Sequence, residues 1–355
     1  MDTREIRMTE RATIGVGVVG LGMISRPHLE GYRAATGADL VAVCDIDPAR
    51  AQAEGARYDA TVYTDMSELL ADPRVDAVAL QLPHQLHHRL AKQALEAGKH
   101  VIVEKPLTVT EAEAEDLITT AAEHGVRLAA AENTRFVRAY VELEKVIRAG
   151  TLGEIRMIRG FIPDQILHEW KDDALGWKRE AFGGGAIIDC APHMLYLMTW
   201  LLGETEVVQA FARGYVPEIA LENHAVICGA TKSGTLFAME FCSVTEYPRG
   251  ERVEVYGSDG AIIIDQVLDP PVVFYRGDQD PKGTPLDVPY DLAGWKHRSI
   301  MAGCQDFVDS IRTGRDPGVD VQHAKYTIRL IECAYESIRR GGLAVDASSP
   351  VPAAS

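Results

Sequence analysis

The chain has 355 residues, a length that suits two domains better than one. It carries 36 Lys and Arg residues against 52 Asp and Glu residues, and the net charge of −16 argues against nucleic acid or an anionic membrane as a partner. The N-terminal residues are charged, no stretch approaches a membrane span in length, and the scattered cysteines are typical of free thiols in a reducing compartment. We therefore predict a cytoplasmic protein.

The first stretch with a clear pattern runs from Thr13 to Asp45. A β-rich apolar run, Ile14 to Val19, leads into the turn Gly20-Leu21-Gly22-Met23-Ile24-Ser25 and then into a helix. Glycine lets such a turn approach a diphosphate closely, and the N–H groups and dipole of the helix attract the negative charge. The glycine pattern also matches one register earlier, from Gly15 to Gly20, but a phosphate turn must follow a strand and open a helix, as only the later register does. Ser25 replaces the third small residue of the pattern and still permits close packing.

Asp45 lies at the end of the second strand of this unit. A carboxylate there accepts hydrogen bonds from both hydroxyls of the adenosine ribose and repels a 2′-phosphate, and the neighbouring Ile46 supplies no cation for such a phosphate. The stretch therefore predicts a dinucleotide site that favours NAD over NADP.

The alternation of strands and helices continues to residue 131. We predict helices at Pro48 to Tyr58, Met66 to Ala71, Leu86 to Ala97 and Glu111 to His124, and strands at Thr61 to Tyr63, Val75 to Leu82, His100 to Val103 and Val126 to Ala131. Parallel neighbours require crossover connections, so this alternation indicates a doubly wound parallel sheet. Ligands bind at the carboxyl ends of such strands. The predicted cofactor contacts are Gly20, Gly22, Met23, Ile24, Asp45, Ile46, Leu82, Pro83, His84, His87, Glu104 and Lys105. On the predicted helix we expect His87 to point toward the cofactor and His88 to be exposed.

The rest of the chain has a different rhythm. A predicted helix from Val137 to Ala149 and a strand from Glu154 to Phe161 precede a loop rich in aromatic and charged residues, Asp164 to Phe182. After a helix ending near Leu202, short runs joined by glycine-containing turns predict an antiparallel sheet. These runs are Glu206 to Phe211, His224 to Ala230, Thr235 to Ser243, Arg252 to Gly257, Ala261 to Asp265 and Val272 to Tyr275. Helices at Ile300 to Thr313 and Ala324 to Arg340 follow, and we expect the tail from Val345 onward to fray. The predicted domains are residues 1–132 and 133–355.

Two further stretches carry chemistry. Lys105, in Glu104-Lys105-Pro106, directly follows the fifth predicted strand, where its charge can stabilise an alkoxide that develops as a hydride leaves the adjacent carbon. Asp189 and His193 are four residues apart in an apolar helix, a spacing that places both on one face, and histidine suits the transfer of a hydroxyl proton near neutral pH. Because proline is tolerated only in the first turn of a helix, Pro192 implies either that the helix starts near Asp189 or that it is kinked.

These motifs together resemble the Gfo/Idh/MocA family of sugar and inositol oxidoreductases. The resemblance rests on the glycine turn, on Pro83 with His87, and on AGKHVIVEKPL at 97–107, GTLGEI at 150–155, GGGAIIDCAPH at 183–193 and AYESIRRG at 334–341. It implies a Rossmann domain followed by an α/β domain whose open, mostly antiparallel sheet makes the oligomer contact, as a homodimer or homotetramer. It also implies that Lys105, Asp189 and His193 line the substrate site, with His193 as the acid and base. Many relatives have glycine where this chain has Ala191.

Further substrate contacts are predicted from the aromatic loop and from the residue that follows the sixth strand. The candidates are Arg135, His168, Trp170, Trp177 and Arg179, beside Lys105, Asp189 and His193. A set of His, Cys and carboxylate residues at ligand spacing is missing from the sequence, so we predict no metal.

Three functions fit this sequence. The first is an NAD-dependent dehydrogenase that oxidises a secondary hydroxyl of a sugar, a sugar derivative or a cyclitol. The second is a glycosidase-like or eliminating enzyme that oxidises its substrate transiently with bound NAD. The third is a sugar or dinucleotide sensor, although a sensor need not retain Lys105, Asp189 and His193.

Overall fold

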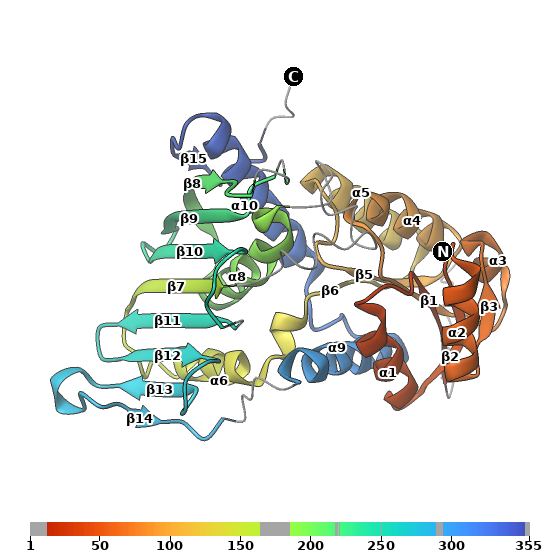
Figure 1. Ribbon diagram of the computed structural model, residues 1–355, viewed down its shortest axis with the longest axis horizontal. Coiled ribbons are helices and arrows are strands. Elements are labelled where there is room, and N and C mark those ends of the chain that lie inside the picture. Colours follow the sequence, from red (N-terminus) through yellow and green to blue (C-terminus); the bar gives the residue numbers. More distant parts are fainter. Residues whose placement is uncertain are drawn as a thin grey trace, which may run out of the picture.

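The computed structural model describes residues 13–163, 185–216, 219, 221–248, 250–288 and 294–351. Two sheets organise these residues, and helices lie between them (Figure 1). The first sheet has six parallel strands in the order β3-β2-β1-β4-β5-β6. Its strands are β1 (Ile14–Val19), β2 (Ala38–Cys44), β3 (Thr61–Tyr63), β4 (Ala77–Leu80), β5 (His100–Glu104) and β6 (Leu128–Ala131). The predicted doubly wound sheet is confirmed.

Helices cover both faces of this sheet. They are α1 (Ser25–Ala34), α2 (Pro48–Tyr58), α3 (Met66–Ala71), α4 (His84–Glu96) and α5 (Glu111–His124). The limits of α5 match the prediction because both ends carry local signals. Thr110 and Glu113 form a reciprocal capping box at the start, and Gly125 takes the left-handed conformation at the end.

The second sheet has nine strands in the order β14-β13-β12-β11-β7-β10-β9-β8-β15. Its strands are β7 (Ile155–Pro163), β8 (Thr205–Arg213), β9 (His224–Thr231), β10 (Leu236–Cys242), β11 (Arg252–Gly257), β12 (Ala261–Asp265), β13 (Val272–Tyr275), β14 (Thr284–Pro285) and β15 (Val345–Asp346). Neighbouring strands are antiparallel except β7 and β10, which pair in parallel. The sheet is therefore mostly, not wholly, antiparallel.

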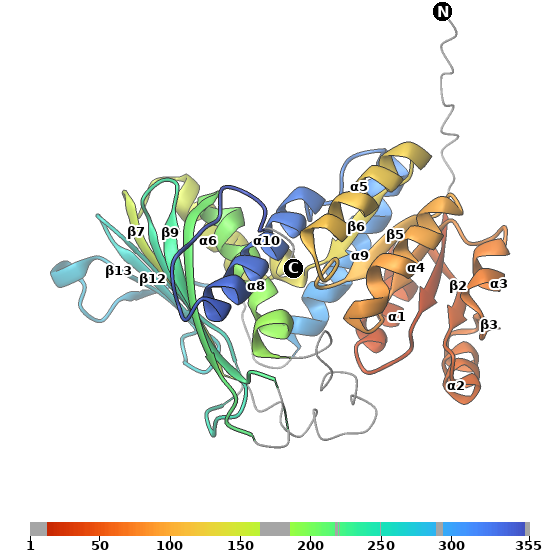
Figure 2. The same cartoon turned by 90° about the horizontal axis from the view of Figure 1, so that it is seen from above.

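The helices of the second region lie on one side of this sheet, the side that faces the first domain (Figure 2). They are α6 (Arg138–Arg148), α8 (Ala186–Leu202) and α10 (Val321–Arg339). Buried side chains of α8 and α10, such as Leu195 and Leu330, form one apolar cluster with Ile227, Phe237 and Phe241 of the sheet. Burial of this cluster fixes α8, and with it Asp189 and His193, between the two sheets.

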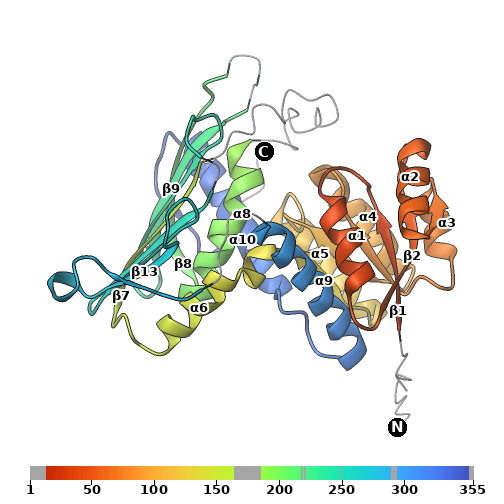
Figure 3. The ribbon, with the colours of Figure 1, turned by 60° about the horizontal axis from the view of Figure 1, so that its bottom comes forward.

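The helix α9 (Trp295–Thr313) belongs by sequence to the second region but packs against α1 (Figure 3). Its apolar residues Ile300, Phe307 and Ile311 share a buried cluster with Leu29 and Tyr32 of α1. A helix from near the C-terminus thus completes the core of the N-terminal sheet.

The expectation of a frayed tail is wrong for its first residues. Val345 and Asp346 pair with Val208 and Val207 as β15, and Val345 and Ala347 are buried. Pairing with β8 and burial of small apolar side chains hold this segment. Within the part of the chain described here, we find no helix with the length and hydrophobicity of a membrane span.

Candidate active site

The glycine turn joins β1 to α1 next to the carboxyl end of β4. Gly20 has φ of 87°, and a Cβ atom there would lie 2.1 Å from the carbonyl oxygen of Gln81. Gly22 instead borders open space, and Met23 is exposed. The N-cap of α1 is Ile24, which has no side-chain oxygen to bond the first N–H groups of the helix. A glycine turn at a helix N-terminus that has no side-chain cap fits a dinucleotide diphosphate.

Asp45 supports this turn from the end of β2. Its buried carboxylate accepts hydrogen bonds from the backbone N–H of Leu21 at 2.7 Å and of Asp47 at 2.9 Å. A carboxylate has further lone pairs, so these bonds leave capacity for ribose hydroxyls. The side chain of Ile46 is exposed, while Arg50 places Nη1 3.4 Å from an Asp45 oxygen. Arg50, which no sequence pattern indicated, brings a cation to the predicted adenosine site.

Gln81 follows β4 and is a second residue that sequence reasoning missed. Its side chain is only 6% exposed, yet neither its amide nitrogen nor its amide oxygen has a hydrogen-bond partner among the described residues. Strand alternation places it on the same face as Ala77 and Ala79, which pack in the α1 cluster. A buried amide beside the glycine turn is a group that a bound dinucleotide would satisfy.

The predicted contact of His87 with the cofactor stays a prediction. The His87 ring is fully buried, with Nδ1 2.8 Å from the carbonyl oxygen of Pro106 and Nε2 2.8 Å from that of Leu82. His84 is also buried, edge-on to His87, whereas Pro83 is partly exposed. His87 therefore supports the chain behind Leu82 and Lys105. The expectation that His88 is exposed is wrong. Its side chain is half-buried, and its Nε2 lies 2.6 Å from an Asp116 carboxylate oxygen.

Lys105 and Asp189 meet across the two regions. The ammonium Nζ of Lys105 donates to the Asp189 carboxylate at 2.8 Å and to the Asp189 carbonyl oxygen at 2.6 Å. Burial alone would lower the pKa of Lys105, but the charge and hydrogen bond of Asp189 outweigh burial and raise it above its usual value. Lys105 is thus a cation at neutral pH, a state that suits an electrostatic group better than a base.

His193 lies one helical turn after Asp189. Its Nδ1 is 2.7 Å from an oxygen of Glu132, which follows β6, and 3.3 Å from the hydroxyl of Thr134. Among described residues none hydrogen-bonds Nε2 of His193. Since β5 and β6 are parallel neighbours, Lys105 and Glu132 follow them at the same edge of the sheet. From α8, Asp189 contacts Lys105 and His193 contacts Glu132.

The helix α8 begins at Ala186, so the alternative start near Asp189 is wrong and Pro192 lies inside the helix. Gly185 precedes it with φ of 102° and offers no side-chain cap. Glu222 substitutes from another segment: its carboxylate accepts from the N–H of Ile187 at 3.2 Å and from the hydroxyl of Tyr335 at 2.9 Å. Burial raises the pKa of Glu222. This external cap fixes the first turn of the helix that carries Asp189.

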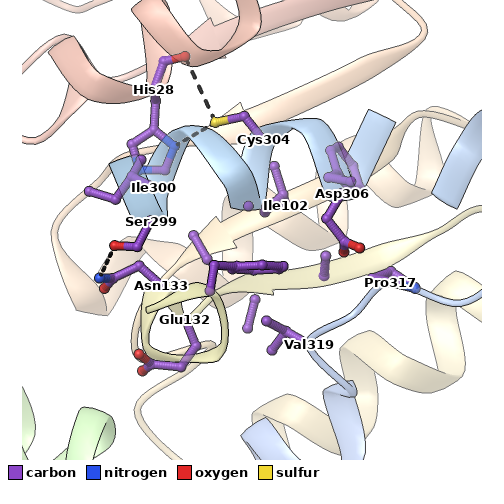
Figure 4. Close-up of a pocket in the computed structure, with 16 residues that line it drawn as sticks. His28, Ile102, Glu132, Asn133, Ser299, Ile300, Cys304, Asp306, Pro317 and Val319 are labelled. Atoms are coloured by element: carbon purple, nitrogen blue, oxygen red, sulfur yellow. Dashed lines mark hydrogen bonds between the residues drawn. The ribbon is translucent and has the colours of Figure 1, made fainter. Parts of the chain in front are cut away.

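Glu104 anchors Lys105 from behind. One carboxylate oxygen accepts from the Lys105 backbone N–H at 2.9 Å, and the other lies 2.9 Å from Nε2 of His28 on α1. The other ring nitrogen of His28 is 3.7 Å from Sγ of Cys304 on α9 (Figure 4). Burial would lower the pKa of His28, but its bonds with Cys304 and Glu104 raise it to about 10. A buried ion pair therefore links the cofactor helix to the strand end that carries Lys105.

A cavity of about 20 Å³ lies beside these residues, between α1, α9 and the end of β6 (Figure 4). That volume holds a single water molecule and excludes a sugar. The cavity is therefore part of the packing, not the substrate site.

Arg135 is the one of the five further predicted substrate contacts that lies within the described residues, and its side chain contacts other protein groups. Its guanidinium lies 4.1 Å from the ring centre of Trp200 and 3.8 Å from Glu144. Its contact with substrate stays a prediction. His168, Trp170, Trp177 and Arg179 lie outside the described residues.

Comparison with known families agrees with this geometry. A model described as an oxidoreductase family with an NAD-binding Rossmann fold matches residues 14–132, and the model of its C-terminal α/β domain matches residues 144–346. The chain belongs to this Gfo/Idh/MocA family. It is thus an oxidoreductase with an NAD-binding domain, as predicted.

Three relatives show the range of this family. A myo-inositol 2-dehydrogenase of Thermotoga maritima is 29% identical, over 91% of this chain and 96% of the relative. A scyllo-inositol 2-dehydrogenase (NAD(+)) of Bacillus subtilis is 27% identical, over 91% and 94%. The crystal structure of the WlbA dehydrogenase of Bordetella pertussis, in complex with NADH and UDP-GlcNAcA, superposes with a TM-score of 0.81 at 25% identity, over 96% and 100%.

Proposed function

We propose that this protein is an NAD-dependent dehydrogenase that oxidises a secondary hydroxyl of a cyclitol, a sugar or a sugar derivative. One observation carries the proposal. A cationic lysine lies at the same edge of the sheet as the glycine turn, together with a histidine whose Nε2 has no hydrogen bond to any described residue. This pair suits removal of a hydroxyl proton together with stabilisation of the alkoxide.

Bound NAD would accept the hydride from the carbinol carbon. Lys105 would donate a hydrogen bond to the substrate oxygen and stabilise its developing negative charge. His193 would accept the hydroxyl proton at Nε2 and return it in the reverse direction. Asp189 holds the Lys105 ammonium through two contacts, so that its position does not depend on the substrate.

The substrate class rests on the relatives named above, of which two are inositol dehydrogenases and one is a dehydrogenase crystallised with a nucleotide sugar. Cyclitols and sugars share secondary hydroxyls flanked by further hydroxyls. We assign recognition of these neighbouring hydroxyls to residues of the proposed substrate domain, 133–355. They are the predicted contacts Arg135, His168, Trp170, Trp177 and Arg179.

The experiment is a screen of purified protein with NAD and a panel of inositols, aldoses, glycosides and nucleotide sugars, with NADH followed at its absorbance maximum. The proposal expects steady NADH formation with at least one compound and a ketone product in equal amount. Conversion of a compound without net NADH would instead indicate transient oxidation. Tight NADH binding without any conversion would indicate a sensor.

We also propose that the open face of the second sheet joins two copies of the chain. Phe211, Val226, Leu236 and Tyr256 project from this face, and each is 36% or more exposed. Arg159 crosses the same face to Glu240 at 3.2 Å and to Glu254 at 3.1 Å. Exposed apolar side chains on a broad flat sheet are typical of a subunit interface. Light scattering of the wild type and of Leu236→Glu tests this, and a wild-type monomer at micromolar concentration would contradict it.

A further inference from the structure

Glu132 is a buried carboxylate beside His193. It directly follows β6, caps the short 3₁₀ helix η1 (Asn133–Phe136), and is only 3% exposed. Burial alone would raise the pKa of Glu132. The interactions with His193 and Thr134 outweigh burial, so the pKa lies below its usual value. Glu132 is therefore ionised over the working pH range.

An ionised carboxylate only accepts hydrogen bonds. Oε1 of Glu132 lies 2.7 Å from Nδ1 of His193, and the same oxygen accepts from the backbone N–H of Thr134 at 3.1 Å. The proton of a neutral His193 ring must then reside on Nδ1. It follows that Nε2 carries the lone pair, which is the state required of a base at that atom.

The carboxylate is held in place from two sides. Its neighbour Asn133 donates from Nδ2 to Oγ of Ser299 on α9 at 2.8 Å. Figure 4 shows the Glu132 side chain turned away from His28 and Cys304. The strand end, η1 and α9 thus present Glu132 to α8 as a fixed acceptor.

Among the described residues, Glu251 is a further carboxyl group that interacts with His193. Glu251, which precedes β11, interacts electrostatically with His193 and accepts a hydrogen bond from the Tyr140 hydroxyl at 2.6 Å. Burial raises the pKa of Glu251. Because Glu251 already bonds Tyr140 and Glu132 contacts Nδ1 directly, Glu132 is the group that selects the tautomer.

We infer that Glu132 is a positioning residue that orients the His193 ring and fixes its proton on Nδ1, leaving Nε2 as the base. The inference rests on the proposed function for its kinetic consequence, but the tautomer itself does not. A carboxylate behind the base would also stabilise the imidazolium that forms when Nε2 takes the substrate proton.

The first arm of the test is ¹⁵N NMR of the histidine rings in the full-length protein, at a pH at which imidazole is neutral, with His193→Asn used to assign the signal. We expect the Nδ1–H tautomer in the wild type and its loss in Glu132→Met, which removes the acceptor. An Nε2–H tautomer in the wild type would overturn the inference, whether or not the protein oxidises a polyol.

The second arm is steady-state kinetics with NAD and the best polyol from the screen. Glu132→Met should lower kcat by roughly 10²-fold. Glu132→Gln keeps an acceptor oxygen and should lower kcat less. KM for NAD should stay within about twofold in both variants. Glu142→Gln is the matched control, because Glu142 on α6 pairs only with Arg138 and Lys145 among the described residues, and it should behave as the wild type. Equal kcat in Glu132→Met and the wild type, with intact folding by circular dichroism, would overturn the inference. If the wild type oxidises nothing, the proposed function fails while the NMR arm still decides the role of Glu132.

Discussion

The ammonium of Lys105 lies 2.8 Å from the carboxylate of Asp189, 84 residues later in the chain. The first residue follows β5 of the parallel sheet, and the second belongs to the helix that packs on the other sheet. This contact therefore joins the predicted cofactor side of the site to the predicted substrate side.

Replacement of Lys105 by Met should lower kcat by about 10² to 10⁴, because the developing alkoxide loses its cation. The affinity for NADH should change little, since the predicted contacts of the adenosine half are at Asp45 and not at Lys105. The variant breaks the largely buried Lys105–Asp189 ion pair, so the free energy of unfolding should fall by about 3 kcal/mol. Adding Asp189→Asn should restore part of this stability without restoring kcat. Stability that falls further in the double variant would contradict this account.

The buried pair of His28 and Glu104 predicts a pH dependence of stability. The pKa of His28 is raised to about 10, after the lowering effect of burial is outweighed by Cys304 and Glu104. A cation with a raised pKa contributes its full stabilisation below its unfolded pKa, about 6.5, and loses it as the pH rises through the folded value. The unfolding free energy of the wild type should thus decrease between about pH 6.5 and 10. His28→Asn should have a lower unfolding free energy that changes less with pH over this range. Urea titrations at several pH values measure both, and an equally steep decrease in the variant would exclude this role of His28.

Cofactor choice should depend on Asp45 and Arg50 together. The wild type should prefer NAD, because the Asp45 carboxylate repels a 2′-phosphate even with Arg50 nearby. Asp45→Ser should improve kcat/KM for NADP relative to NAD by about 10- to 100-fold, the range for one hydrogen bond to a charged group. Adding Arg50→Ala should remove that gain. A wild type that turns over NADP as well as NAD would refute the assignment.

The amide of Gln81 should strengthen NADH binding and lower the stability of the ligand-free protein. Gln81→Met has a similar volume and removes two buried polar atoms that lack partners among the described residues. The ligand-free variant should be more stable by about 1 to 3 kcal/mol, and the Kd for NADH should rise about tenfold, since the dinucleotide loses its hydrogen-bonding group. Gln93→Met serves as control, because Gln93 bonds Ser67 on the surface. A less stable variant with unchanged Kd would show that Gln81 is only structural.

The sequence predicted those parts of the fold whose signals are local. The glycine turn and the ends of α5 depend on residues within one turn of each other, and their limits are confirmed. The sequence predicted a helix from Ile300 to Thr313, but it did not predict that this helix packs on α1, because α1 lies 276 residues earlier in the chain. The two-residue strand β15 is too short to show periodicity.

The candidate site was predictable where motif residues touch one another. Lys105 and Asp189 are such a pair. Glu132 was missed because a single acidic residue after a strand has no distinctive pattern, although its position beside the carboxyl end of β5 was a usable signal. The contacts of the His87 ring with the Leu82 and Pro106 carbonyl groups were not predicted, because helical spacing does not reveal them.

The central claim is that a hydride passes from a secondary carbinol carbon to NAD while His193 takes the hydroxyl proton. The most direct measurement uses the polyol that reduces NAD in the screen, deuterated at the oxidised carbon, with mass spectrometry of the dinucleotide. The account predicts reduced NAD one mass unit heavier, formed with the ketone in equal amount, and a rate about 10²- to 10⁴-fold lower in His193→Asn. Deuterium that is lost to water or retained in the product, or His193→Asn that reacts at the wild-type rate, would contradict it.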